Sequence, residues 1–134
     1  MKYLIVIIAL LAGCTTQWIR PDTRETQLQE EAGRLAELVR SKKITKAQAA
    51  DRLNIKRIEV VGANPFDDEV FAYYRKLAEQ RDQGKIAQAE AQSRMVKKLA
   101  DVRTRYRQRT EGGKPAPEPV FTRFMLRLYG QPPL

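Results

Sequence analysis

The sequence predicts an all-α fold, in which two helical hairpins form a small irregular bundle and a short amphipathic helix follows near the C-terminus. Three observations favour this fold. After the first dozen positions, the chain of 134 residues is rich in Ala, Gln, Arg, Lys and Glu, whose side chains lose little conformational freedom in a helix. Apolar residues then recur at spacings of three and four, which is the helical period. Two segments also repeat one residue pattern.

The first helix is expected at residues 23–41. Pro21 and Asp22 precede it, and acidic residues follow in its first turns, as is typical of a helix start. One face of this segment is apolar, as expected of a helix that packs on a core. That face consists of Leu28, Ala32, Leu35, Leu38 and Val39.

A second helix is expected to begin after Thr45. Thr45 and Gln48 have the spacing of a capping box, in which each side chain bonds the backbone N–H of the other residue. The helix covers at least residues 46–53. Residues 54–61 fit either a helical continuation or a short strand, and we favour a helix that ends at Gly62.

A third helix is expected to open at Asp67 and Asp68 and to end at Gly84, a residue suited to a left-handed cap. Its buried face is expected to comprise Val70, Phe71, Tyr74, Leu77 and Ala78. A fourth helix is expected at residues 86–109. Its inner face is expected to comprise Ile86, Ala89, Ser93, Val96, Leu99, Ala100 and Tyr106.

The two predicted hairpins resemble each other in sequence. Leu35-Ala36-Glu37 leads to the turn Lys43-Ile44, and Leu77-Ala78-Glu79 leads to the turn Lys85-Ile86, at a constant offset of 42 residues. A duplicated helix–turn–helix unit explains this match. A chance match between segments of similar composition is the alternative.

The N-terminus has the layout of a secretory signal peptide. Lys2 precedes an apolar run from Tyr3 to Ala12. This run is too short to cross a bilayer, because a spanning helix needs about 20 apolar residues. We therefore expect residues 1–13 to be a cleaved signal peptide rather than a transmembrane anchor.

The apolar run ends in Leu11-Ala12-Gly13-Cys14, which resembles the lipobox of bacterial lipoproteins position by position. The resemblance implies cleavage before Cys14 and lipid attachment to its sulfur and its new amine. Cys14 is the only cysteine in the chain, so no internal disulfide competes for it. Two or three acyl chains would make the membrane attachment lasting, whereas one chain holds weakly. The alternative is an ordinary signal peptide with a chance cysteine.

The same resemblance implies a location. Thr15 follows the cysteine, and this position is similar to that of lipoproteins sorted to the outer membrane. We therefore expect the protein in the outer membrane, facing the periplasm. A location in the inner membrane is the alternative. Residues 14–22 would form the lipidated cysteine and its tether, and the roughly eight residues after Cys14 would span at most about 3.5 Å each. The hairpin region is also similar to uncharacterised small helical-hairpin lipoproteins, a similarity that implies no chemistry.

The composition excludes several kinds of catalytic and metal site. The chain has no histidine and a single cysteine, so Ser-His-Asp and Cys-His catalysis are impossible and zinc lacks its usual ligands. Asp67-Asp68-Glu69 is the densest acidic cluster, and its place at a helix start explains it better than glycoside chemistry does. We therefore expect no catalytic residue, no metal and no cofactor.

The first candidate binding surface is the basic end of the fourth helix. The net charge of +9 suits anionic partners, and Asp101 alone opposes the cations of this segment in the sequence. An anionic lipid or envelope polymer is the expected ligand; nucleic acid is not expected for an exported protein. The alternative is a solvated helix end. The candidate anion-binding residues are Arg94, Lys97, Lys98, Arg103, Arg105, Arg107 and Arg109.

The second candidate is the C-terminal segment, residues 120–134, which follows a Gly/Pro-rich linker at residues 112–119. Its apolar face could dock into a groove of a partner protein, or it could fold back onto the hairpins, which we favour. The candidate docking residues are Val120, Phe121, Phe124, Met125 and Leu128.

Together these features predict a membrane-anchored, non-enzymatic interaction or scaffold protein of the cell envelope. Its hairpin domain would span residues 23–111, and its expected partner is an envelope protein. Binding of an anionic polymer or lipid through the basic helix is the alternative, and an enzyme acting on the cell wall is a remote one.

Overall fold

The structure, a computed structural model, describes residues 22–134. The predicted signal peptide, Cys14 and nearly all of the tether lie outside the described residues. Five helices follow one another along the described chain, which confirms the all-α prediction. They are α2 (Thr23–Arg40), α3 (Lys46–Val60), α4 (Pro65–Asp82), α5 (Gln88–Glu111) and α6 (Val120–Leu128).

Side-chain caps determine where the helices of the first hairpin begin. Asp22 accepts a hydrogen bond from the backbone N–H of Arg24 at 2.9 Å and starts α2. Thr45 and Gln48 form the predicted capping box, with reciprocal hydrogen bonds of 3.1 and 2.9 Å. The helix α3 then continues to Val60, so the helical alternative for the ambiguous segment is confirmed.

The second hairpin begins earlier than predicted. The side chain of Asn64 accepts hydrogen bonds from two backbone N–H groups that follow it, at 3.0 and 3.2 Å. This cap starts α4 at Pro65 instead of at Asp67. Proline suits the first helical position because it lacks the N–H that would have no partner there. Gly84 adopts a left-handed φ of 70° in the turn that follows, as predicted.

The buried face of α5 differs from the predicted one. Ala89 and Ser93, expected inside, are exposed. The prediction took its register from Ile86, which lies in the turn before α5 begins and packs on the core from there. A turn residue does not follow the helical period, so a register counted from it is wrong. The residues of α5 that are buried are Ala91, Met95, Leu99 and Val102.

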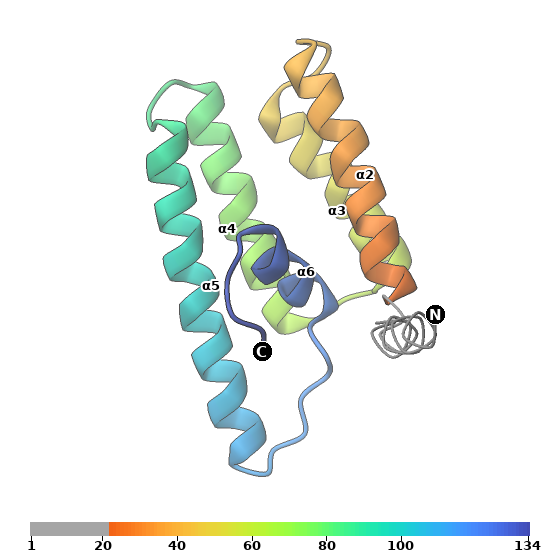
Figure 1. The fold of residues 1–134 in the computed structure, drawn as a ribbon, viewed down its shortest axis with the longest axis vertical. Helices are drawn as coiled ribbons and strands as arrows, with labels where there is room; N and C mark the ends of the chain where they lie inside the picture. The colour runs from red at the N-terminus through yellow and green to blue at the C-terminus, as the bar shows by residue number, and fades with distance from the viewer. Residues whose placement is uncertain (1–21) are drawn as a thin grey trace, which may run out of the picture.

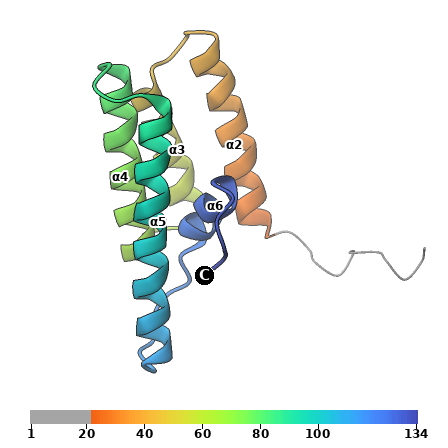
Figure 2. The ribbon, with the colours of Figure 1, turned by 60° about the vertical axis from the view of Figure 1, so that its left-hand side comes forward.

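The four longer helices form an open array. Each packs on the next one along the chain: α2 on α3, α3 on α4 and α4 on α5. Figure 1 shows the two hairpins side by side, with both hairpin turns at one end of the molecule. The short helix α6 contacts α2, α4 and α5, and Figure 2 shows it lying between the two hairpins, away from those turns. The open side of the array is therefore filled by α6 over only part of its length.

The helix α6 completes the hydrophobic core. Phe121, Phe124, Met125 and Leu126 are all buried, and they pack in one cluster with residues of the four longer helices. The ring of Phe121 lies edge-on to that of Phe71, with 6.2 Å between the ring centroids. The C-terminal segment thus folds back onto the hairpins, which is the alternative we favoured.

Candidate functional site

A buried carboxylate holds the start of α6. Asp67 of α4 accepts hydrogen bonds from the backbone N–H of Thr122 at 2.7 Å, from its hydroxyl at 2.8 Å, and from the N–H of Phe121 at 3.2 Å. These N–H groups lie in the first turn of a helix, where no partner exists within the helix itself. Burial raises the pKa of Asp67, while the hydrogen bonds and the charge of Arg57 oppose that rise.

The other two members of the acidic cluster bind elsewhere. Asp68 pairs with the buried guanidinium of Arg57 at 2.7 Å. Glu69 pairs with Lys98 at 2.6 Å and with Arg105 at 2.5 Å. Asp67 and Asp68 do lie in the first turn of α4, as predicted. The three carboxylates nevertheless bind different partners, and each of them stabilises a contact between segments of the fold.

An ion-pair network joins α6 to the start of α2. Arg123 of α6 pairs with Asp22 at 2.5 Å, and also with Glu25 and Glu118. Glu25 is buried, and Arg127 forms an ion pair with its second carboxylate oxygen at 2.6 Å. Asp67 and this network therefore fasten α6 to α4 and to α2, which belong to different hairpins.

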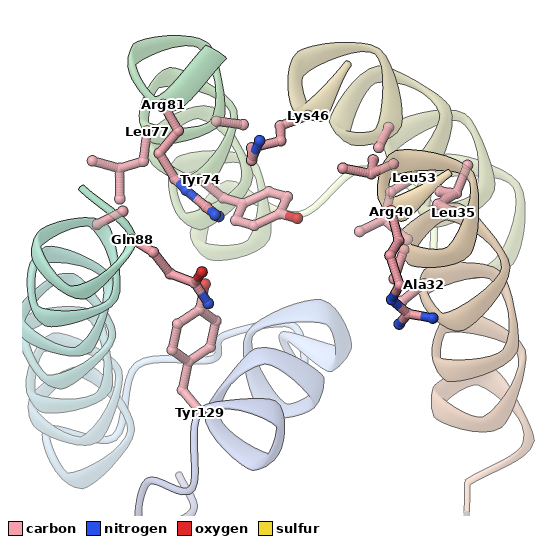
Figure 3. Close-up of a pocket in the computed structure, with 15 residues that line it drawn as sticks. Ala32, Leu35, Arg40, Lys46, Leu53, Tyr74, Leu77, Arg81, Gln88 and Tyr129 are labelled. Atoms are coloured by element: carbon pink, nitrogen blue, oxygen red, sulfur yellow. The ribbon is translucent and has the colours of Figure 1, made fainter. Parts of the chain in front are cut away.

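Beyond the C-terminal end of α6, the two hairpins line a half-open groove with a volume of about 410 Å³, which we call the inter-hairpin groove. Residues from α2, α3, α4 and α5 line it, together with Tyr129, which follows α6 (Figure 3). Alanines contribute much of the lining, and their small side chains leave space between the helices. The apolar floor consists of Ala32, Leu35, Ala49, Leu53, Leu77, Ala78 and Ala91.

Three cationic side chains, Arg40, Lys46 and Arg81, line the groove (Figure 3). Arg40 pairs with Glu37 on its own helix, and Lys46 lies 4.0 Å from Asp82. Arg81 forms no ion pair with any carboxylate of residues 22–134. It is therefore the cation of the groove that is free to bind an anion.

Two tyrosines project into the same space from different elements, Tyr74 from α4 and Tyr129 from the segment after α6 (Figure 3). Burial raises the pKa of Tyr74, and it raises the pKa of Tyr129 to about 12, with Tyr74 adding to that rise. The charge of Arg81 opposes both shifts. Both phenols are therefore protonated at neutral pH and can donate hydrogen bonds to a ligand.

The predicted anion-binding surface on α5 is largely occupied by the protein itself. Lys98 and Arg105 both pair with Glu69 of α4, and Arg105 also pairs with Asp101 at 2.9 Å. The expectation that Asp101 alone opposes these cations was wrong. The reason is that Glu69 comes from a neighbouring helix, which spacing along α5 cannot show.

The remaining residues of that surface fall into two groups. Arg103 and Arg107 donate hydrogen bonds to backbone carbonyls of the C-terminal tail, at 3.1 and 3.0 Å, and Arg94 pairs with a glutamate one turn earlier on α5. Lys97 and Arg109 are exposed. Only these two of the seven cations have no protein partner within the described chain.

The predicted docking face of the C-terminal segment is not a surface. Val120, Phe121, Phe124 and Met125 are buried in the core. Leu128 is the one residue of that set at the surface, with 58% of it exposed. The face is occupied by the hairpins of the same chain, so it has no room for a partner.

Sequence reasoning missed the inter-hairpin groove. Lys46, Arg81 and Tyr129 lie on three separate elements, and no motif connects them in the sequence. The one available hint was the internal repeat, because two similar hairpins packed side by side can share a concave face. The position of α6 on that face, which decides where the groove lies, depends on the contacts of Asp67 and Arg123 across the chain.

No group of three or more potential metal ligands comes together within residues 22–134, and none of the helices in this range is both long enough and apolar enough to cross a bilayer. No protein-family model, curated protein or solved structure matches the chain.

Proposed function

We propose that this chain is a lipid-anchored, non-enzymatic interaction protein of the cell envelope, and that the inter-hairpin groove is its binding site. The observation that carries the proposal is the groove itself, which combines an apolar floor with an unpaired arginine and two phenol donors. Ligand sites typically have such a lining, in which a few polar groups orient a ligand on an apolar surface. The absence of histidine from the chain also favours binding over catalysis.

The binding role is tested by site-specific photocrosslinking in cells. Benzoylphenylalanine is placed at Gln88, which is exposed and lines the groove, or at Ala72, which is exposed on α4 outside it. We expect an adduct with an envelope component at Gln88 and none at Ala72. Equal adducts at both positions, or no adduct at either, would contradict a binding site in the groove.

The lipid anchor is supported by the resemblance of residues 11–14 to a lipobox. Radiolabelled palmitate should enter the wild-type chain and should not enter the Cys14→Ser variant. The labelled chain should sediment with membranes. Equal labelling of the two chains, or no labelling of either, would overturn this part of the proposal.

The alternative role, binding of an anionic polymer through the basic end of α5, has weaker support. Five of its seven candidate cations already bind carboxylates or carbonyls of this chain. A polymer would have to displace these contacts before it could bind. The groove offers Arg81 without any such competition.

A further inference from the structure

We propose that the inter-hairpin groove binds a fatty acid, whose carboxylate contacts Arg81 and whose single hydrocarbon chain lies on the apolar floor. This inference rests on the proposed function, because it names the ligand of the same groove. Three properties of the groove support it: its size, the chemistry of its floor, and the pairing of its cations.

The size of the groove favours a narrow ligand. Its volume of about 410 Å³ is at the small end of the range for small-molecule pockets. The helix α6 bounds the groove at one end, and Asp67 and Arg123 hold it in place. A single hydrocarbon chain is narrow enough to lie in a groove of this volume between the two hairpins.

The floor of the groove suits a hydrocarbon chain along its length. Leu35 and Leu53 come from the first hairpin, and Leu77 comes from the second. Alanines make up the rest of the floor and carry no polar side-chain group. Such a surface gains free energy from each methylene that it removes from water. Affinity should therefore rise with chain length until the groove is full.

The cations of the groove favour one carboxylate as the head group. Arg40 and Lys46 already have the carboxylates of Glu37 and Asp82 nearby. Arg81 has none within the described chain. A guanidinium binds a carboxylate through two parallel hydrogen bonds, so one free arginine matches one carboxylate. The protonated phenols of Tyr74 and Tyr129 can donate further hydrogen bonds nearby.

The test uses the full chain in phosphatidylcholine nanodiscs and a photoreactive dodecanoic acid that carries a diazirine on its chain. After irradiation, mass spectrometry locates the labelled residues. We expect labels within residues 32–53 and 74–91, which line the groove. Arg81→Gln should reduce labelling at least tenfold, and Arg103→Gln, a matched change outside the groove, should leave it unchanged. Circular dichroism confirms that each variant is folded.

Competition by unlabelled amphiphiles then tests the contact of the hydrocarbon chain and the contact of the carboxylate separately. Octanoate, decanoate and dodecanoate should compete with affinities that rise about three- to fourfold per methylene, the factor expected for a buried CH₂ group. Dodecyltrimethylammonium has a similar chain and the opposite charge, and it should compete poorly. Ala36→Trp should also reduce labelling, because the indole fills the groove from an exposed position.

The outcomes separate this inference from the proposed function. Labels spread over the outer helix surfaces, or labelling unaffected by Arg81→Gln and Ala36→Trp, would overturn the fatty-acid assignment. If the acid fails to label the groove while the crosslinker at Gln88 still captures a polypeptide, the fatty-acid assignment is wrong and the binding role of the groove stands. If the crosslinker also captures nothing, both proposals fail.

Discussion

At the scale of single residues, two buried side chains, Asp67 and Arg57, together hold α6 in position. Asp67 accepts hydrogen bonds from the first turn of α6. Arg57, which is also buried, lies over the rings of Phe71 and Phe121 at 5.2 and 5.6 Å and pairs with Asp68. A buried charge is stable only when hydrogen bonds and opposite charges compensate its lost hydration. Removal of either charged group should therefore also destabilise the other.

Replacement of Asp67 tests this dependence. Asp67→Ala leaves two buried N–H groups and one hydroxyl without a partner, so we expect the free energy of unfolding to fall by about 2–3 kcal/mol. Asp67→Asn keeps an acceptor oxygen and should lose less. Urea unfolding measures both changes. Asp101→Ala, at an exposed site on α5, should change stability by less than about 0.5 kcal/mol; a loss equal to that of Asp67→Ala would contradict the role of Asp67.

Asp22 gives stability a defined pH dependence. Hydrogen bonds from Arg24 and then from Arg123 lower its pKa from 3.8 to about 2 in the folded chain, although burial opposes the shift. A carboxyl with a lowered folded pKa stabilises the protein above its unfolded pKa, and this contribution disappears as the pH falls from about 4 to 2. Asp22→Asn keeps a good helix cap, so it should cost about 1 kcal/mol at pH 7 and almost nothing near pH 2. Urea unfolding at several pH values across that range measures the stability difference between the wild-type protein and Asp22→Asn. A difference that does not change with pH would contradict the prediction.

At the scale of elements, α3 and α5 begin in the same backbone conformation with different caps. Thr45 has φ −80° and ψ 166°, and Ala87 has φ −78° and ψ 161°. Thr45 forms a capping box with Gln48, whereas Ala87 supplies no side-chain cap. The residue three places after Ala87 is Glu90, which could complete a second capping box. The second hairpin thus lacks the capping hydroxyl that Thr45 supplies in the first.

Restoring that hydroxyl should stabilise the protein. We expect Ala87→Thr to raise the free energy of unfolding by about 1 kcal/mol, and Thr45→Ala to lower it by a similar amount. Thermal unfolding would measure both changes. Ala89→Thr places the same side chain inside the first turn, where it cannot cap, and should give no increase. If Ala89→Thr stabilises as much as Ala87→Thr, the gain does not come from capping.

At the scale of the whole molecule, the sequence predicts those features that depend on neighbours along the chain. The capping box at Thr45 and the glycine turn at Gly84 are local, and each was predicted. The buried face of α5 was predicted wrongly, because its register was counted from a turn residue. The cap that Asp67 provides to α6, the Glu69 pairs and the groove join segments that lie far apart in the chain. No spacing rule relates such segments, so the candidate site could not be predicted although its helices could.

The open array also leads us to expect that the fold requires the C-terminal segment. Consecutive helices cover one another on one side only, so the other side of each hairpin needs a separate cover. The helix α6 provides it for Leu28 of α2, Val70 of α4 and Leu99 of α5, which are all fully buried in the same cluster. A chain without α6 would expose these residues to water.

A chain that ends at Gly113 should therefore lose its cooperative unfolding transition. It lacks Phe121, Phe124 and Met125, and removal of one such buried side chain costs about 2–5 kcal/mol, so their joint loss matches the whole stability of a typical domain, about 5–15 kcal/mol. We expect residual helix by far-UV circular dichroism, binding of a hydrophobic dye and no sharp melting transition. A chain that ends at Gly130 keeps α6 and should still melt cooperatively. Cooperative melting of the shorter chain would mean that the two hairpins form a sufficient core between themselves, and that α6 is an accessory rather than a part of the fold.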